Sequence, residues 1–237
     1  MWVSKPPGPL APPIRPVHHV ARMSAGVFLL HGHGRTGLSM GFLASELGHE
    51  GFATAAPSYG MRRSMEEILD YVLPRAAAFE ATLDGPMHIA THSLGGLVAR
   101  ALIHRQRPKR LGRVVQLGPP NQGSELADAL HDAKLSNAVL GPVAPYLRTN
   151  RPKVNDAIFG VVDYELGVIA GDVSVRLVPE SILPRPNDGK VSVAATRIDG
   201  MADHIVVDVP HSMLPFHPDS VSQVLAFIQT GHFRRDG

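Results

Sequence analysis

The chain has no cysteine among its 237 residues. This absence excludes disulfide bonds, thiolate metal sites and catalysis by a cysteine nucleophile. It leaves the cellular compartment open, because a cysteine-free chain is stable under oxidising and reducing conditions alike.

Long hydrophobic runs are also missing. The longest purely apolar stretches, such as residues 26–30 and 205–207, are far shorter than the ~20 residues that cross a bilayer. Residues 1–24 carry six prolines between positions 6 and 16 where a signal peptide would have its apolar core. We interpret this segment as an extended surface arm or an addition to the natural chain. The lack of a recognisable signal peptide favours the cytoplasm without fixing the compartment.

Charge of one sign is scarce too, since 23 Lys and Arg face 21 Asp and Glu, a net charge of +2. The basic residues are spread along the chain, so we expect no nucleic-acid partner. Hydrophobic residues make up 44% of the sequence, which excludes disorder for its bulk. The length fits one α/β domain, which we place at residues 25–237.

Short apolar runs alternate with helix-like stretches from Ala25 onward, the pattern of a mostly parallel sheet with helices on both faces. Ser64 and Glu67 form a capping box that opens a helix, which Pro74 is expected to kink or split. Residues 124–160 interrupt the alternation. We predict strands at 26–30, 52–56, 87–90, 114–117, 167–170 and 205–209, and helices at 38–47 and 219–228, besides those that follow Ser64 and Ser93.

The strongest local signal is the run Thr91–Gly96 (THSLGG), which lies between a predicted strand and a predicted helix. A nucleophilic serine on a strained strand-to-helix turn needs small neighbours, and Gly95 and Gly96 supply them. An ordinary N-cap serine is the alternative. The glycines and the preceding strand favour the nucleophile elbow.

Together with four further motifs, this run resembles the α/β-hydrolase superfamily, more closely its bacterial lipase and esterase branch. The resemblance extends from about Gly26 to Phe233, and Thr91 departs from the glycine most common at its position. It implies a mostly parallel sheet flanked by helices with a small cap insertion. The further motifs are LHGHG at 30–34, GPPNQGS at 118–124 and NDGKV at 187–191, followed by PHS at 210–212.

The resemblance also implies an oxyanion hole formed by the backbone N–H groups of His33 and Leu94. No cofactor is implied. His31 and His33 would otherwise suggest a metal pair, but no HExxH motif and no nearby carboxylate cluster supports one.

In this fold the catalytic base follows the last strand, which selects His211 among 13 histidines. His204 precedes that strand, His217 belongs to the turn before the closing helix, and His92 is expected to point into the fold.

Two aspartates compete for the third position of the triad. Asp172 ends a predicted strand, whereas Asp188 lies in the NDGKV motif, which matches the surroundings of the acid in related lipases. Gly189 allows the tight turn that would aim a short carboxylate at His211. We therefore predict Asp188.

The insertion at 124–160 has two interpretations. Its apolar residues form either a lid over the acyl site or the underside of packed helices, and Ser124 is expected to cap its first helix. The apolar residues are Leu126, Leu130, Leu135, Val139 and Leu140.

These observations predict a serine hydrolase of carboxylic esters that acts through Ser93, His211 and Asp188 on a small-molecule or lipid ester, with short to medium acyl chains preferred. Acyl transfer or thioester hydrolysis by the same triad is the alternative within enzymes. A non-catalytic binding module with this fold is the alternative of another class. The oligomeric state stays open.

Overall fold

The computed structural model describes residues 24–174 and 178–235. Apart from Ser24, the predicted N-terminal arm at 1–24 lies outside the described residues. Among those described, no helix combines the length and apolar character needed to span a bilayer.

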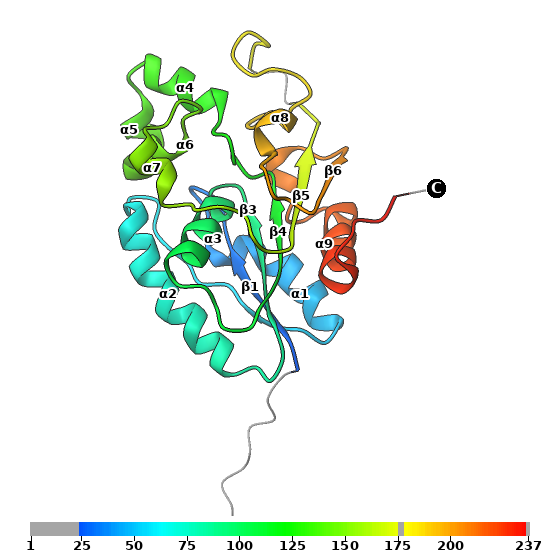
Figure 1. The fold of residues 1–237 in the computed structure, drawn as a ribbon. Helices are drawn as coiled ribbons and strands as arrows, with labels where there is room; N and C mark the ends of the chain where they lie inside the picture. The colour runs from blue at the N-terminus through cyan, green and yellow to red at the C-terminus, as the bar shows by residue number, and fades with distance from the viewer. Residues whose placement is uncertain (1–23, 175–177, 236–237) are drawn as a thin grey trace, which may run out of the picture.

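Six parallel strands form one sheet in the order β2-β1-β3-β4-β5-β6 (Figure 1). Every residue of β1, β3 and β5 is buried, as expected for central strands covered on both faces. The predicted mostly parallel sheet is thus confirmed. The strands are β1 (Gly26–Leu30), β2 (Ala53–Ala55), β3 (Met87–His92), β4 (Leu111–Leu117), β5 (Leu166–Gly171) and β6 (Asp203–Val207).

Helices cover both faces of this sheet (Figure 1). One face packs against Ile68 of α2 and Leu97 of α3, and the opposite face packs against Leu43 of α1 and Phe227 of α9. The helices are α1 (Gly41–His49), α2 (Met65–Ala81), α3 (Leu94–Arg105), α4 (Glu125–Asp132), α5 (Ser136–Val139), α6 (Ala144–Leu147), α7 (Lys153–Ala157), α8 (Val193–Thr196) and α9 (Pro218–Thr230), with 3₁₀ turns η1 (Gly37–Met40), η2 (Gly141–Val143) and η3 (His211–Met213).

The order in which the strands follow one another across the sheet reverses at β1. The next strand in the sequence, β2, pairs with one side of β1, and β3 pairs with the other side. The helices that follow β1 and β3 therefore cover opposite faces. In open parallel sheets, ligands bind in the crevice that such a divergence leaves at the carboxyl ends of the strands. The segments after Leu30 and His92 meet there.

Three sequence predictions are wrong in detail. Of the kink or split predicted at Pro74, the split is not found: α2 runs unbroken through Pro74, which is exposed, so the carbonyl that loses its N–H partner can bind water. The helix predicted at 38–47 divides into η1 and α1. The last strand begins at Asp203 and ends at Val207, two residues before the predicted range of 205–209.

Residues 124–160 form the short helices α4 to α7 between β4 and β5. They lie over one end of the sheet, beside the C-terminal ends of β3 and β4 (Figure 1). Val143, Leu147 and Phe159 pack into the same core as α2 and α3, so this cap is anchored to the body.

Candidate active site

Ser93 lies at the junction of β3 and α3 with φ 54° and ψ −123°. This conformation is rare for a residue with a side chain and costs about 1–3 kcal/mol. Backbone bonds hold it in place, since Ser93 N donates to Leu117 O at 2.9 Å and Gly96 N donates to Ser93 O at 2.8 Å. The Ser93 hydroxyl forms no N-capping hydrogen bond. The turn therefore has the geometry predicted for an elbow.

Gly95 makes this turn possible by letting α3 approach β1. A Cβ atom at Gly95 would lie 2.3 Å from the Leu30 carbonyl oxygen, so no other residue fits without moving the backbone.

The loop that carries Asp188 is organised by its own short polar side chains. Asn187 Oδ1 accepts from Gly189 N at 2.9 Å, and Gly189 has φ +93°. Asp188 Oδ1 accepts from Lys190 N at 3.0 Å and Val191 N at 2.9 Å. With one carboxylate oxygen held by these backbone donors, the other is free to face a partner.

That partner is His211, whose Nδ1 lies 2.7 Å from Asp188 Oδ2. Both side chains are buried, and His211 N also donates to Asp188 O at 2.9 Å. Gly118 leaves the space that the pair occupies, because a Cβ there would lie 3.1 Å from both bonded atoms. The structure thus brings together the two residues predicted as acid and base.

Asp172 is placed differently. It is exposed, and its backbone N donates to Val207 O at 3.2 Å. Desolvation and the neighbouring Asp208 raise the pKa of its carboxyl. No ion pair joins Asp172 to a histidine within the described residues.

The other histidines considered in the sequence also lie elsewhere. His204 falls inside β6, not before the strand, and its Nε2 lies 3.0 Å from Thr196 Oγ1. His217 is the N-cap of α9, as expected for the turn before that helix, and accepts from Asp219 N.

His92 is buried beside the nucleophile, as predicted, and its ring centroid lies 4.8 Å from that of His211. Burial and the nearby positive charges hold its pKa well below the usual range, so the ring is neutral. Its Nε2 lies 3.0 Å from the His211 carbonyl oxygen, which can only accept, so Nε2 carries the proton. His92 therefore fixes the backbone of His211 and leaves its own Nδ1 without a partner among the described residues.

The loop after β1 is fixed through His31. Its Nε2 accepts from Tyr59 N at 3.1 Å, so Nδ1 carries the proton and donates to Gly32 O at 2.9 Å. Tyr59 also stacks on the ring at 3.9 Å and donates its hydroxyl to His31 O. His31 is thus held by protein groups, and the next side chain, His33, extends into a cavity.

That cavity has a volume of ≈ 100 Å³ and is lined by Ser93, Leu94, His33 and His211. Burial lowers the pKa of His33, and its Nε2 has no hydrogen-bond partner within the described chain. We call this space the serine cavity. Its apolar wall comes mainly from the cap, through Leu126, Ala127, Leu130, Leu140 and Leu147.

Two of the apolar cap residues singled out in the sequence, Leu135 and Val139, do not line the cavity and are exposed. Ser124 stands at the N-cap of α4, as predicted, but makes no capping bond. Its hydroxyl instead donates to Lys190 O at 2.8 Å, because the loop that carries Asp188, the acid loop, passes beside it. The cap is therefore tied to the loop that carries Asp188.

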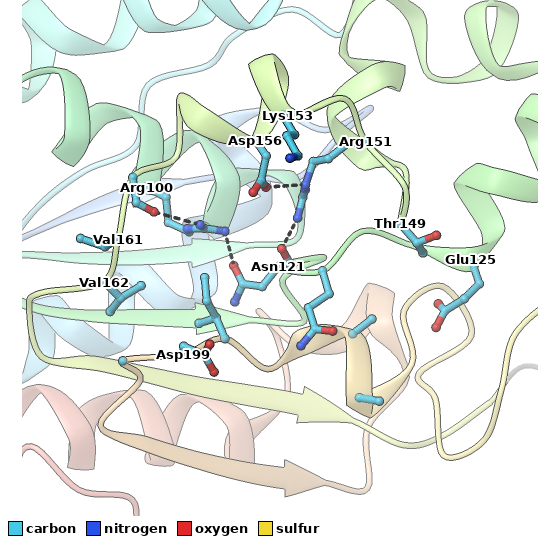
Figure 2. A pocket seen from close by; sticks show the side chains of 16 residues that line it. Arg100, Asn121, Glu125, Thr149, Arg151, Lys153, Asp156, Val161, Val162 and Asp199 are labelled. Carbon is cyan, nitrogen blue, oxygen red and sulfur yellow. Dashed lines mark hydrogen bonds and ion pairs between the residues drawn. The ribbon is translucent and has the colours of Figure 1, made fainter.

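A larger cavity of ≈ 810 Å³ contains none of these reactive groups (Figure 2). Arg100, only 5% exposed, donates to Asn121 Oδ1 and Gly160 O, and Arg151 donates to Asn121 O and pairs with Asp156 at 2.8 Å. Burial lowers the pKa of Arg100 to about 10, so it stays charged at neutral pH. We call this space the arginine cavity.

Arg35, Gly118 and Lys190 were not singled out from the sequence. Arg35 and Lys190 line the serine cavity, and Gly118 lies against the pair Asp188 and His211. Gly118 and Lys190 lie inside motifs that were singled out, and Arg35 follows one directly. Their roles depend on which loops converge, which a single sequence does not reveal.

No protein-family model and no curated protein sequence matches the chain. Solved structures do, and all those named here are below 25% identical. A Bacillus licheniformis lipase, BlEst2 in mature form, is 16% identical with a TM-score of 0.70 over 91% of this chain and 95% of its own. A metagenomic carboxyl esterase, MGS0156, is 17% identical with a TM-score of 0.64 over 95% and 75%. A putative thioesterase from Silicibacter is 20% identical with a TM-score of 0.57 over 88% and 77%. The chain has the α/β-hydrolase fold.

Proposed function

We propose that the protein is a serine hydrolase of carboxylic esters. The observation that carries the proposal is that His211, bonded to Asp188, lines the same cavity as Ser93, which stands on a strained turn without a capping bond. The solved lipase and esterase structures of the same fold support it.

In the first step Ser93 Oγ attacks the ester carbonyl carbon while His211 Nε2 takes the hydroxyl proton. Asp188, bonded to Nδ1, fixes the tautomer and stabilises the imidazolium. The N–H groups of His33 and Leu94 are the proposed donors to the oxyanion, and one such donor contributes about 3 kcal/mol.

The tetrahedral intermediate then collapses. The bond between carbon and the alcohol oxygen breaks, the alcohol leaves with the proton from His211, and an ester of Ser93 remains. Water, deprotonated by His211, attacks this acyl-enzyme and releases the acid and the free serine. No redox step is involved, so the chemistry is balanced by water alone.

Labelling with a fluorophosphonate followed by peptide mass spectrometry tests the nucleophile. We expect the label on Ser93 and its loss in Ser93→Ala, whereas Ser124→Ala, which removes another hydroxyl from the same cavity, keeps it. Hydrolysis of p-nitrophenyl butyrate should fall in Ser93→Ala by about 10⁴-fold or more. A label on another residue, or more than a tenth of wild-type turnover in Ser93→Ala, contradicts the proposal.

Thioester hydrolysis or acyl transfer by the same triad is the second candidate. The structural similarity to a putative thioesterase supports thioester hydrolysis as a candidate reaction. Matched oxygen and sulfur esters of butyrate, assayed with and without an added alcohol acceptor, separate the three reactions. A non-catalytic binding module predicts that none of them is faster than in Ser93→Ala.

A further inference from the structure

Two cations line the serine cavity besides the groups already assigned. Arg35 follows the loop after β1, and Lys190 belongs to the acid loop between β5 and α8. No acidic side chain is among the described residues that line this cavity. The charged part of its surface is therefore of one sign.

Neither cation is neutralised by an ion pair within residues 24–174 and 178–235. The guanidinium of Arg35 donates to Ser212 O at 3.2 Å and lies 5.8 Å from the ring centre of Phe216. Asp188, whose charge acts to raise the pKa of Lys190, accepts bonds from two backbone N–H groups and His211. Lys190 is an exposed residue that also lines the cavity.

The two charges act on side chains that line the cavity. Desolvation and the proximity of Arg35 lower the pKa of Lys190. The same two cations contribute to the lowered pKa of His92, and Lys190 contributes to that of His33. A positive potential of this kind attracts an anion to a partly desolvated site.

The cap supplies an apolar wall to the same cavity, with Leu126, Leu130 and Leu140 among its larger members. A ligand that satisfies both this wall and the cations has an apolar chain and a negative charge. Under the proposed function the acyl chain lies along the leucines, which leaves the alcohol portion of the ester for the cations.

We propose that the preferred substrates are esters whose alcohol portion carries an anionic group, a phosphate or a carboxylate, bound by Arg35 and Lys190. This inference rests on the proposed function and names the substrate class of the same site. Phosphate and carboxylate share the chemistry that the two cations recognise.

Three butyrate esters distinguish the possibilities, because they share the acyl group and a primary alcohol. They are 1-butyrylglycerol, which is neutral, 1-butyrylglycerol 3-phosphate, and the butyrate ester of 4-hydroxybutanoate. For the wild-type protein we expect kcat/KM of at least one anionic ester to exceed that of the neutral ester by about tenfold, since hydrogen bonds to charged groups contribute that much. Added salt should reduce this ratio.

The variant Lys190→Gln should reduce the ratio at least threefold, and Arg35→Gln likewise. Lys109→Gln is the matched control, because Lys109 is exposed before β4, at the opposite end of the strands, and the same charge is removed. Its ratio should equal that of the wild type. The larger of the two anionic ratios assigns phosphate or carboxylate.

A wild-type ratio of one or less, or a ratio that survives both cavity variants, overturns the inference while ester hydrolysis stands. If no ester is turned over faster than by Ser93→Ala, the proposed function fails instead. Calorimetric titration of Ser93→Ala with 1-butyrylglycerol 3-phosphate and with 4-butyryloxybutanoate then still tests the anion site. Binding of either ester weakened by Lys190→Gln but not by Lys109→Gln supports it, and no binding of either refutes it.

Discussion

The serine cavity and the arginine cavity differ in what their polar groups do. In the arginine cavity, the side chains of Arg100 and Arg151 bond to Asn121, Gly160 and Asp156 around a volume of ≈ 810 Å³. In the serine cavity, which is far smaller at ≈ 100 Å³, a strained serine lies with His211, whose ring is bonded to Asp188. Size alone therefore does not mark a reactive site.

The two cavities meet at the segment after β4. Asn121 holds the arginine network on one side, and Ser124, three residues on, lines the serine cavity on the other. We infer that the arginine cavity supports the cap and the serine cavity performs the chemistry. Substitutions in the two should consequently separate stability from turnover.

The largest effect should come from Asp188→Asn. An amide keeps the shape but favours the wrong tautomer of His211, so kcat for p-nitrophenyl butyrate should fall by up to ~10⁴. Asp172→Asn is the matched control and should stay within about threefold of wild type, since Asp172 is exposed and its backbone N–H, which bonds to Val207 O, is unchanged by the substitution. The reverse ranking, in folded proteins at pH 8, would move the acid to Asp172.

The second effect concerns the arginine cavity. Arg100→Met should lower the free energy of unfolding by about 1–3 kcal/mol, because the buried Asn121 Oδ1 and the half-buried Gly160 O lose their donor. Urea denaturation measures it. Below the unfolding transition, kcat should remain within a few-fold of wild type. A loss of kcat comparable to that of Asp188→Asn would show that the two cavities are not separate in function.

How far the sequence alone predicts these two regions depends on how local each signal is. The elbow was predictable because Gly95, Gly96 and the preceding apolar strand are adjacent in sequence. Asp188 is predicted as the acid because its NDGKV motif matches the surroundings of the acid in related lipases and because Gly189 allows a tight turn. The hydrogen bonds of Arg100 were not predictable, since Arg100 and Gly160 are 60 residues apart and the sequence around either residue does not indicate that they are in contact.

Element boundaries show the same limit. The proline at position 74 predicts a kink or a split in helix α2. Whether a proline interrupts a helix depends in part on whether the carbonyl that loses its N–H partner faces solvent, which is a tertiary property. Ser124 was correctly placed at the start of α4, yet its hydroxyl bonds to Lys190 O, a residue brought there by the fold.

Acidification should destabilise the protein through histidines that are buried and neutral. Burial lowers the pKa of His88 and of His204 to about 4, and lowers those of His31 and His92 as well. The unfolded chain binds these protons near pH 6.5 while the folded chain resists them, so stability is full above pH 6.5 and is lost as pH falls toward 4.

For the buried His88 the loss by pH 5 is on the order of 1–2 kcal/mol. Thermal unfolding between pH 8 and 5 measures it. His88→Asn should flatten the profile, because an amide oxygen can replace Nδ1 as the acceptor for Arg113 N without titrating. An unchanged slope in this variant would exclude His88 as a source of the acid sensitivity.

The smallest effect tests the apolar wall of the serine cavity. Leu140 lines that cavity from the cap, and replacing it with alanine removes three carbon atoms, a methine and two methyl groups, next to the proposed acyl site. Because the existing space is only ≈ 100 Å³, we expect the wild type to prefer short to medium acyl chains. In Leu140→Ala the preferred acyl chain should be about two to four carbons longer, since each additional CH₂ that becomes buried contributes ~0.8 kcal/mol.

Leu135→Ala is the matched control, since Leu135 is an exposed cap residue outside the cavity. A series of p-nitrophenyl esters from acetate to palmitate measures both optima. An identical profile for wild type and Leu140→Ala, or a wild-type optimum at sixteen carbons, would mean that the acyl chain lies elsewhere and that the leucine wall serves only to pack the cap.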